Sequence, residues 1–350
     1  MSWGVAYQVV AYAAFVICLF AAVRIWIKSG WVQGLWQLVV LLGFVIVYWL
    51  LESYAHLRAP FYTYPPGPLI YMIPYFTGFP TYAPVMDPCA TQAGSEIPLS
   101  VLLMEASLTF GLLWTARLLV VVTTPTFLPA PYRALLIPFM TGLVALLVDL
   151  PLDPILSDSC ECTPVTNTVN PVCPHDADEV DRQHGGLTFW QWFAEPEAKF
   201  LDQWYGVPMF NFAIWYCAPV ALAASAILLG WMGPVSSWLA AAIQALIAFV
   251  FGVAAFTAPS TQPPKLQLAL MVLAILVSLT IVFPAWSTFR RDNPFRWEFV
   301  VPSALFALFP LVALLAGANG MQTGSWLLVV SLVATLLTLF FLIAPYWKWP

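Results

Sequence analysis

Long apolar runs dominate the pattern of this chain, and they recur at a length that suits the crossing of a membrane. A helix needs about 20 apolar residues to cross the hydrocarbon core of a bilayer. On that basis the sequence predicts spans at 4–26, 34–56, 98–122, 132–152, 208–231, 236–257, 266–287, 299–317 and 325–346. We therefore predict an all-α fold, a polytopic transmembrane helical bundle of eight or nine spans. It forms one membrane domain over residues 1–350.

Two long segments interrupt the apolar runs. Residues 57–97 are rich in proline and tyrosine, and residues 154–207 combine a cysteine-containing insert with a cluster of aromatic side chains. The other connections are short, which favours antiparallel neighbouring helices. The first run has no basic residues before it and no small-residue cleavage site after it. We therefore expect a retained span rather than a signal peptide.

Composition supports the same class of protein. The chain is 61% hydrophobic and 8% charged, with a mean hydropathy of +0.85. Soluble domains are about a quarter charged, so we expect a multi-pass integral membrane protein whose surroundings are membrane lipid. The net charge of −5 is small and dispersed, and it gives no reason to expect a nucleic-acid partner.

The basic residues predict an orientation, because cytoplasmic loops carry an excess of Lys and Arg. Placing the N-terminus outside leaves four basic residues on the exterior side: Arg58, Arg182, Lys199 and Lys265. The same placement puts eight on the cytoplasmic side: Arg24, Lys28, Arg117, Arg133, Arg290, Arg291, Arg296 and Lys348. We therefore predict an exterior N-terminus, a cytoplasmic C-terminus and two exterior long segments.

Cysteine placement agrees with this orientation. Two cysteines fall in predicted spans, where they are most simply small buried residues. Four others fall in the predicted exterior segments: Cys89, Cys160, Cys162 and Cys173. An oxidising compartment favours two disulfides among these four. The alternative is a metal site that would also use His175, but the spacing lacks the paired Cys-x-x-Cys elements of structural zinc sites.

Four carboxyl side chains fall within or at the ends of predicted spans: Glu52, Glu105, Asp149 and Asp153. An ionised side chain costs about 2.5–3.5 kcal/mol at the centre of a membrane on insertion scales. The predicted topology brings all four toward the exterior side. Either they do chemistry together or each has a separate structural reason, such as a surface cap at Asp153, an interfacial pair at Glu52 or a hydrogen bond at Glu105.

The two aspartates stand four residues apart, a spacing that places side chains on one face of a helix. Pro151 and Pro154 should disturb the helix at this point, because proline lacks the backbone N–H that continues it. Broken helices at membrane depth are tolerated where they line a cavity. The sequence therefore predicts a helix break beside Asp149 and Asp153, and it favours a functional role for the pair.

Aromatic side chains are dense around the start of the fifth predicted span: Trp190, Trp192, Trp204, Tyr205, Trp215 and Tyr216. Aromatic walls suit a long, flat, conjugated ligand, and their faces stabilise a passing cation. Such a group is also typical of anchoring at the membrane interface. Both interpretations stay open at this point.

Several stretches together carry a resemblance to a known family. They are "ESYAHLRAPFYTYP", "IPLSVLLME", "VDLPLDP", "WQW" and "WYGVPMFNFAIWY", which occur in that order over roughly residues 45–220. The chain is similar there to the CruF-type integral-membrane carotenoid hydratases, including those of the bacterioruberin pathway. It departs from the family in the length of segment 57–97 and in the cysteine insert of 160–186.

The resemblance implies the addition of water across a terminal C=C bond of a linear carotenoid or other polyprenoid, in a bacterial or archaeal cytoplasmic membrane. It implies neither a redox cofactor nor a metal. We expect Asp149 or Asp153 to donate the proton, and the other aspartate or Glu52 to orient the water and accept its proton. The expected substrate-binding residues are Asn211, Trp215, Trp192, Tyr205, Glu105 and Tyr64.

Two other functions fit the pattern less well. A small-molecule or proton-coupled transporter would also use intramembrane acids and proline-interrupted helices, but two matching halves are not evident in the sequence. A non-catalytic membrane subunit would use the long exterior segments to bind a partner protein or a pigment. Pigment analysis separates these functions from a hydratase.

Overall fold

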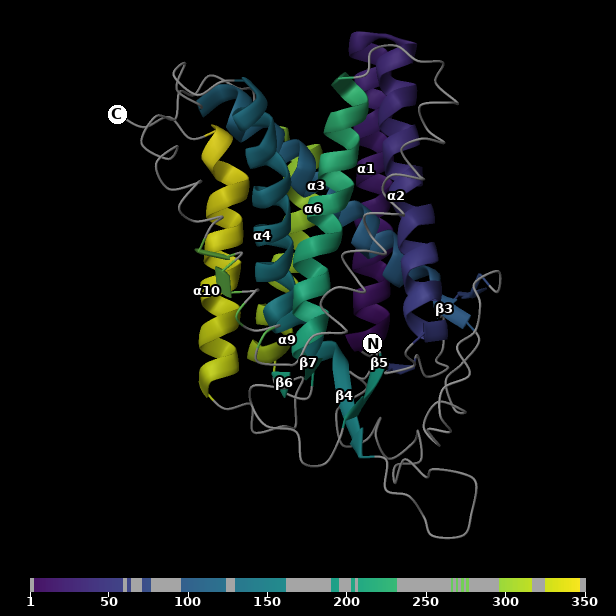
Figure 1. Ribbon diagram of the computed structural model, residues 1–350, viewed down its shortest axis with the longest axis vertical. Helices are drawn as coiled ribbons and strands as arrows, with labels where there is room; N and C mark the ends of the chain where they lie inside the picture. The colour runs from purple at the N-terminus through teal and green to yellow at the C-terminus, as the bar shows by residue number, and fades with distance from the viewer. Residues whose placement is uncertain are drawn as a thin grey trace.

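The structure, a computed structural model, describes most of the apolar runs. The described residues are 3–58, 62–63, 71–76, 96–123, 130–161, 190–194, 203–204, 207–231, 296–316 and 325–346, with single positions between 266 and 276. They form seven α-helices: α1 (Trp3–Ser29), α2 (Trp31–Arg58), α3 (Leu99–Thr123), α4 (Ala130–Leu156), α6 (Met209–Trp231), α9 (Trp297–Leu315) and α10 (Ser325–Ile343). A 3₁₀ turn, η2 (Ala344–Tyr346), follows α10. Figure 1 shows these helices aligned along the long axis of the molecule.

The helices confirm the predicted class of protein. Six of them, all but α6, contain stretches long and apolar enough to cross a membrane, and α6 contains the shorter apolar stretch Asn211–Ile227. The predicted spans at 236–257 and 266–287 lie outside the described residues, apart from the single positions. The described part of the chain is thus a helical bundle with six candidate membrane spans.

A single glycine connects the first two helices. Gly30 has a φ of 94°, in the left-handed region, and its N–H donates to the Trp26 carbonyl at 3.0 Å. Glycine adopts this conformation without strain and commonly ends helices. A Cβ built on Gly34 would lie 2.5 Å from the Trp26 Cα. The two helices therefore extend further than predicted and turn back on each other within one residue.

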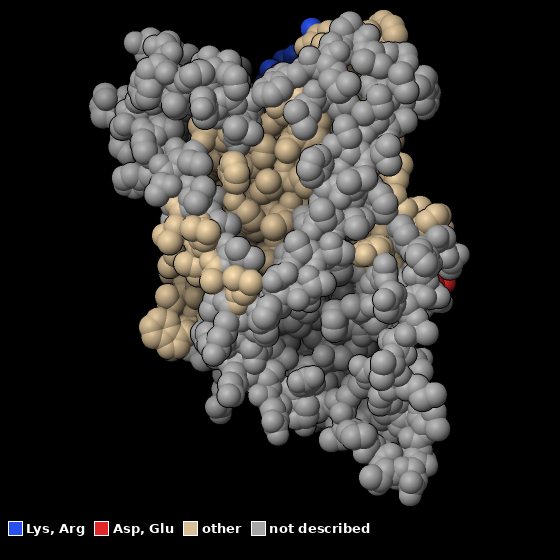
Figure 2. Space-filling view, in the orientation of Figure 1, with Lys and Arg blue, Asp and Glu red and all other residues tan. Residues whose placement is uncertain are grey.

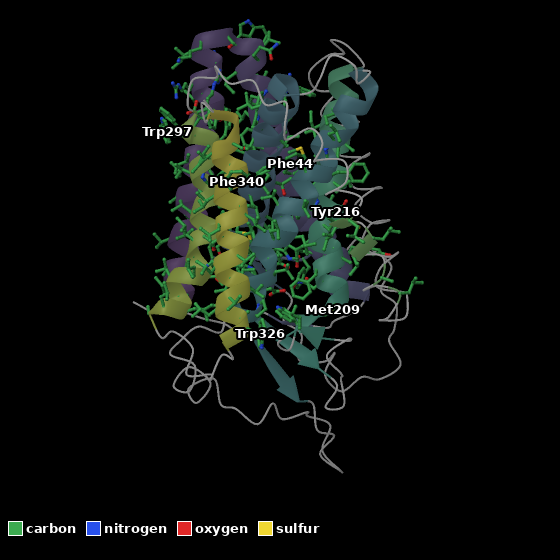
Figure 3. The ribbon with its side chains drawn as sticks, turned by 90° about the vertical axis from the view of Figure 1, so that its left-hand side faces the viewer. Phe44, Met209, Tyr216, Trp297, Trp326 and Phe340 are labelled. Atoms are coloured by element: carbon green, nitrogen blue, oxygen red, sulfur yellow. The ribbon has the colours of Figure 1, made fainter. Side chains whose placement is uncertain are left out.

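Helix α3 lies at the centre of the bundle and packs against α1, α2, α4 and α9. A helix that is apolar on all sides is typical of such a buried position. The outer helices instead expose large apolar side chains, including Ile27 at 79% and Trp326 at 70%. Trp297 and Trp326 lie near opposite ends of the bundle (Figure 3). Exposed Trp at both ends is typical of the two interfaces of a membrane.

Short strands connect the segments that follow α2 and α4, which is a departure from the all-α prediction. Strand β5 (Trp190–Ala194) pairs in parallel with β4 (Ser157–Glu161) and antiparallel with β1 (Tyr62–Thr63). Two further pairs join β2 (Met72–Pro74) to β3 (Glu96–Pro98), and β6 (Gln203–Trp204) to β7 (Val207–Pro208). Backbone groups in these segments thus find partners far away in sequence, a pairing that local residue preference does not predict.

The end of the bundle opposite these strands is held by a partly buried ion pair. Arg24 Nη1 on α1 lies 2.8 Å from Glu298 Oε2 on α9; the Glu298 side chain is 1% exposed and that of Arg24 is 32%. Next to it, Trp114 stacks on Phe299 with ring centroids 5.1 Å apart, and the Arg117 guanidinium lies 5.0 Å from the Trp114 ring centroid. We call this region the ion-pair end. Figure 2 shows basic atoms at this end and an uncharged described surface in the hollow below it.

Candidate functional site

Helix α4 carries Asp149 and Asp153 without the predicted break. It runs through Pro151 and Pro154 and ends at Leu156. Both aspartates are buried, with exposed fractions of 0% and 1%. Because the helix is continuous, their four-residue separation places them on one face. The alternative in which Asp153 caps a helix at the surface is wrong, since the residue lies within the helix and away from solvent.

A side chain from another segment replaces a backbone donor that proline removes. Pro154 has no N–H, so the Leu150 carbonyl lacks its donor from one turn ahead. The indole N–H of Trp204, on β6, donates to that carbonyl at 3.2 Å. The predicted break assumed that no other donor would replace the missing N–H of Pro154. The Trp204 contact is one physical reason why the helix continues beside the aspartates.

Asn211, one of the predicted substrate-binding residues, connects the two aspartates. It lies on α6, and its amide Nδ2 donates to Asp149 Oδ2 at 3.4 Å and to Asp153 Oδ2. The other oxygen of Asp149, Oδ1, is buried and has no hydrogen-bond partner within the described part of the chain. Two carboxyl groups that share one amide donor repel each other when both are ionised. The arrangement is therefore most stable when the pair holds a proton.

Close packing of α4 against α6 sets the position of Asn211. A Cβ built on Gly142, two turns before Asp149, would lie 2.6 Å from the Tyr216 carbonyl oxygen and would also collide with Val220. Only glycine lets the two backbones approach this closely. The position of the amide relative to the aspartates thus depends on a residue with no side chain.

The two glutamates meet beside the aspartates. The carboxyl groups of Glu52, on α2, and Glu105, on α3, form a side-chain hydrogen bond, and the charge of Asp153 acts on Glu105. Glu105 is buried, and its Oε2 has no hydrogen-bond partner among the described residues. A hydrogen bond between two carboxyl groups requires one of them to be protonated. We call Glu52, Glu105, Asp149 and Asp153 the carboxyl cluster.

Hydrogen bonds between α2, α3 and the segment 71–76 hold the glutamates in place. The Tyr48 and Thr109 hydroxyls are 2.7 Å apart and join α2 to α3. The Ser53 hydroxyl, next to Glu52, accepts a hydrogen bond from the Phe76 N–H at 3.0 Å. The Trp49 indole N–H donates to the Pro74 carbonyl oxygen at 3.0 Å. Strand β2 within this segment pairs with β3, which leads directly into α3, so the segment connects the helix of Glu52 to that of Glu105.

Tyr7, on α1, is a member of the site that the sequence interpretation missed. Its side chain is fully buried inside the bundle, within electrostatic range of the carboxyl cluster. Figure 3 shows oxygen atoms gathered inside the bundle between the labelled Tyr216 and Met209. A phenol at the exterior end of a predicted span, at the same depth as the acids, was the available signal.

Of the remaining predicted substrate-binding residues, the structure describes the side chain of only one. Trp215 is half-buried on α6 and packs against the core. The backbone of Trp192, in β5, pairs with that of Tyr62, while its side chain is outside the described atoms. Tyr64 and Tyr205 lie outside the described residues. Their expected contact with substrate therefore stays a prediction.

The predicted disulfides also stay predictions. Cys89, Cys162 and Cys173 lie outside the described residues, and of Cys160 the structure describes only the backbone, within β4. The cysteines whose side chains are described, Cys18 and Cys217, are free thiols. Within the described ranges, no group of three or more His, Cys, Asp or Glu side chains has an arrangement that could hold a metal ion.

The fold and site together define a class: a polytopic helical bundle with a buried carboxyl cluster at one end. No family model, no curated protein and no solved structure matches the chain.

Proposed function

We propose that this protein is a hydratase-like membrane enzyme that adds water across a terminal C=C bond of a linear carotenoid or related polyprenoid. The observation that carries the proposal is the pair of buried carboxyl groups, Asp149 and Asp153, that share the amide of Asn211. The resemblance of segments 45–220 to carotenoid hydratases supplies the substrate class.

The reaction needs a proton donor, a shielded tertiary carbocation and a positioned water. In the proposed mechanism the proton held by the aspartate pair passes to the terminal alkene carbon, and the C=C electron pair forms the new C–H bond. Asp149 Oδ1, which has no hydrogen-bond partner among described atoms, is the oxygen best placed to give that proton up. A positioned acid of this kind contributes about 10²–10⁴-fold to a rate.

The second carboxyl pair serves the other half of the reaction. Water attacks the cation, forms the C–O bond and loses a proton to the deprotonated member of the Glu52–Glu105 pair. The negative charge on this pair also stabilises the cation, an effect that is large where water is excluded. Aromatic faces such as that of Trp215 would add a smaller cation–π contribution.

The test is expression in a host that makes lycopene, followed by separation of the pigments and determination of their masses by mass spectrometry. We expect products heavier by one water with the wild-type protein and a loss of at least about 100-fold in Asp149→Asn and Asp153→Asn. Glu298→Gln is the matched control, because it makes the same change at a buried carboxyl group of the opposite end. Unchanged hydration in both aspartate variants would remove the pair from the mechanism.

A proton-coupled carrier is the second candidate function. The observation that favours it is the hydrogen bond between Glu52 and Glu105, since carboxyl groups that share protons inside a membrane also occur in proton relays. An unchanged pigment profile, together with proton-dependent uptake by vesicles that is lost in Glu105→Gln, would favour the carrier over the enzyme.

A further inference from the structure

Strand β6 and helix α4 meet at a backbone carbonyl that lies between the two aspartates in the sequence. In an uninterrupted helix the Leu150 carbonyl would accept the N–H of residue 154, but that residue is a proline and has no N–H. The indole N–H of Trp204 donates to this carbonyl instead, at 3.2 Å. Pro154 thus leaves an acceptor on α4 for a side chain of another segment, within one turn of both Asp149 and Asp153.

The segment that carries Trp204 also carries Asn211. Strand β6 pairs with β7 in an antiparallel register that sets Trp204 opposite Val207, and α6 begins directly after β7, at Met209. The Val207 side chain is fully buried and that of Trp204 half-buried. Asn211, in the first turn of α6, then donates to both aspartates. One short stretch of chain therefore holds α4 at two places, by an indole at the Leu150 carbonyl and by an amide at the carboxyl groups.

Further strands attach the end of α4 to the start of α6. Strand β7 contacts β5, which pairs with β4, and β4 begins at Ser157, directly after α4 ends at Leu156. A shift of the last turns of α4 relative to Asn211 would disturb these strand contacts and the indole bond together. The aspartates and the amide they share are thus placed by one connected set of contacts.

We propose that Trp204 is a positioning residue of the hydration reaction, which acts on the aspartate pair through the Leu150 carbonyl. The inference rests on the proposed function. It gives Pro154 a role as well, because the proline removes the N–H that would satisfy this carbonyl inside the helix. The position of the proton donor therefore depends on Trp204. The indole itself does not react; it fixes the carboxyl groups relative to the shared amide.

Trp204→Phe tests this role, because phenylalanine keeps an aromatic ring and removes the N–H. We expect kcat for hydration, per unit of folded protein in lipid nanodiscs, to fall roughly 10- to 100-fold with KM little changed, since misplacement by about 1 Å costs on the order of 100-fold. Trp114→Phe is the matched control. It removes an indole N–H that donates to Gln37 at 2.9 Å at the ion-pair end, and should leave hydration unchanged. Unchanged hydration in Trp204→Phe would overturn the proposal.

Pro154→Ala separates positioning from a simple loss of packing. Alanine restores the N–H that the helix itself donates to Leu150, so α4 no longer needs the indole. Pro154→Ala alone should keep hydration, because a carbonyl oxygen accepts two hydrogen bonds. In this background Trp204→Phe should cost less than about 3-fold, a clear departure from additivity. The same 10- to 100-fold loss in both backgrounds, or loss of hydration in folded Pro154→Ala, would overturn the proposal.

Infrared spectra of the same variants without substrate separate failure of this inference from failure of the proposed function. Carboxyl bands, protonated or ionised, that disappear in Asp149→Asn or Asp153→Asn belong to the pair. Trp204→Phe should shift these bands, addition of Pro154→Ala should return them, and Trp114→Phe should leave them in place. If the wild-type protein hydrates no carotenoid but the bands respond in this way, the hydration proposal fails and the positioning stands. If the bands do not respond, the positioning fails whatever the reaction.

Discussion

The two ends of the bundle hold buried carboxyl groups in opposite ways. At the ion-pair end, Glu298 meets the Arg24 guanidinium at 2.8 Å, and aromatic rings stack around the pair. In the carboxyl cluster, Asp149 receives its hydrogen bond from a neutral amide, and Glu105 bonds to another carboxyl group. At one end a carboxyl group is paired with a guanidinium, and at the other the carboxyl groups bond to an amide and to each other.

Under the proposed function, the Arg24–Glu298 pair supports the structure and the carboxyl cluster performs the chemistry. A paired carboxylate costs little to keep once both partners are in place, while removal of one partner leaves the other buried alone. Carboxyl groups that share one donor, or that bond to each other, instead share protons that can move between them. Burial of acidic side chains by itself therefore does not distinguish the two ends; the identity of their partners does.

The largest expected effect compares the buried amides of the two ends. Asn211→Leu removes the donor that the two aspartates share, and we expect hydration to fall on the order of 100-fold because the proton donor is misplaced. Gln37→Leu removes the acceptor of the Trp114 indole N–H, a 2.9 Å bond at the ion-pair end, and should leave hydration unchanged. Product per unit of folded protein is the measurement. A similar loss in both variants would contradict the comparison.

The next effect concerns the glycines that let helices approach. Gly142→Leu should force α4 away from the Tyr216 carbonyl, lower the unfolding free energy by about 1–3 kcal/mol and reduce hydration as well. Gly111→Leu meets the Phe299 carbonyl and Ser303 hydroxyl between α3 and α9, and should lower stability alone. Heating followed by size-exclusion chromatography measures stability. Full hydration by folded Gly142→Leu would refute its role in placing Asn211.

A smaller effect, on stability, is expected when single carboxyl groups at the two ends are replaced by amides. Glu298→Gln leaves Arg24 without its partner and should lower the unfolding free energy by about 1–3 kcal/mol, less than for a fully buried pair because Arg24 is 32% exposed. Glu105→Gln removes one of several like charges and should cost less than about 1 kcal/mol or raise stability. Apparent melting midpoints in one detergent would compare them. A larger loss of stability in Glu105→Gln than in Glu298→Gln would contradict the distinction between the two ends.

The smallest effect is a pH dependence at the ion-pair end. Burial, followed by the charge of Glu298, raises the pKa of Tyr346 above its ordinary value. A tyrosine of this kind stays neutral in the folded protein while it ionises in the unfolded chain. Its contribution to stability is complete below about pH 10 and is lost as the pH rises above that value. As the pH rises above about 10, the melting midpoint should fall less steeply in Tyr346→Phe than in the wild type. Equal decreases in both proteins would exclude a contribution of Tyr346 ionisation to stability.

Particular elements show how far the sequence could predict the fold. Apolar runs and their lengths located α1, α2, α3, α4, α6, α9 and α10, and their alternating direction placed the four acids at one end. The helix break in α4 was wrong, because the donor that replaces the missing N–H of Pro154 comes from Trp204, about fifty residues later. The short strands were missed because their partners are equally distant in sequence.

The sequence by itself determined which segments are helical and how far along its helix each polar side chain lies, since both follow from local hydropathy and a rise of 1.5 Å per residue. The tertiary structure decided which of those side chains meet. Glu52, Glu105, the aspartates and Asn211 come from four helices, and their contacts depend on how each helix is rotated about its axis. That rotation is set by packing at places such as Gly142, where a close approach of two backbones leaves no separate signal in the chain.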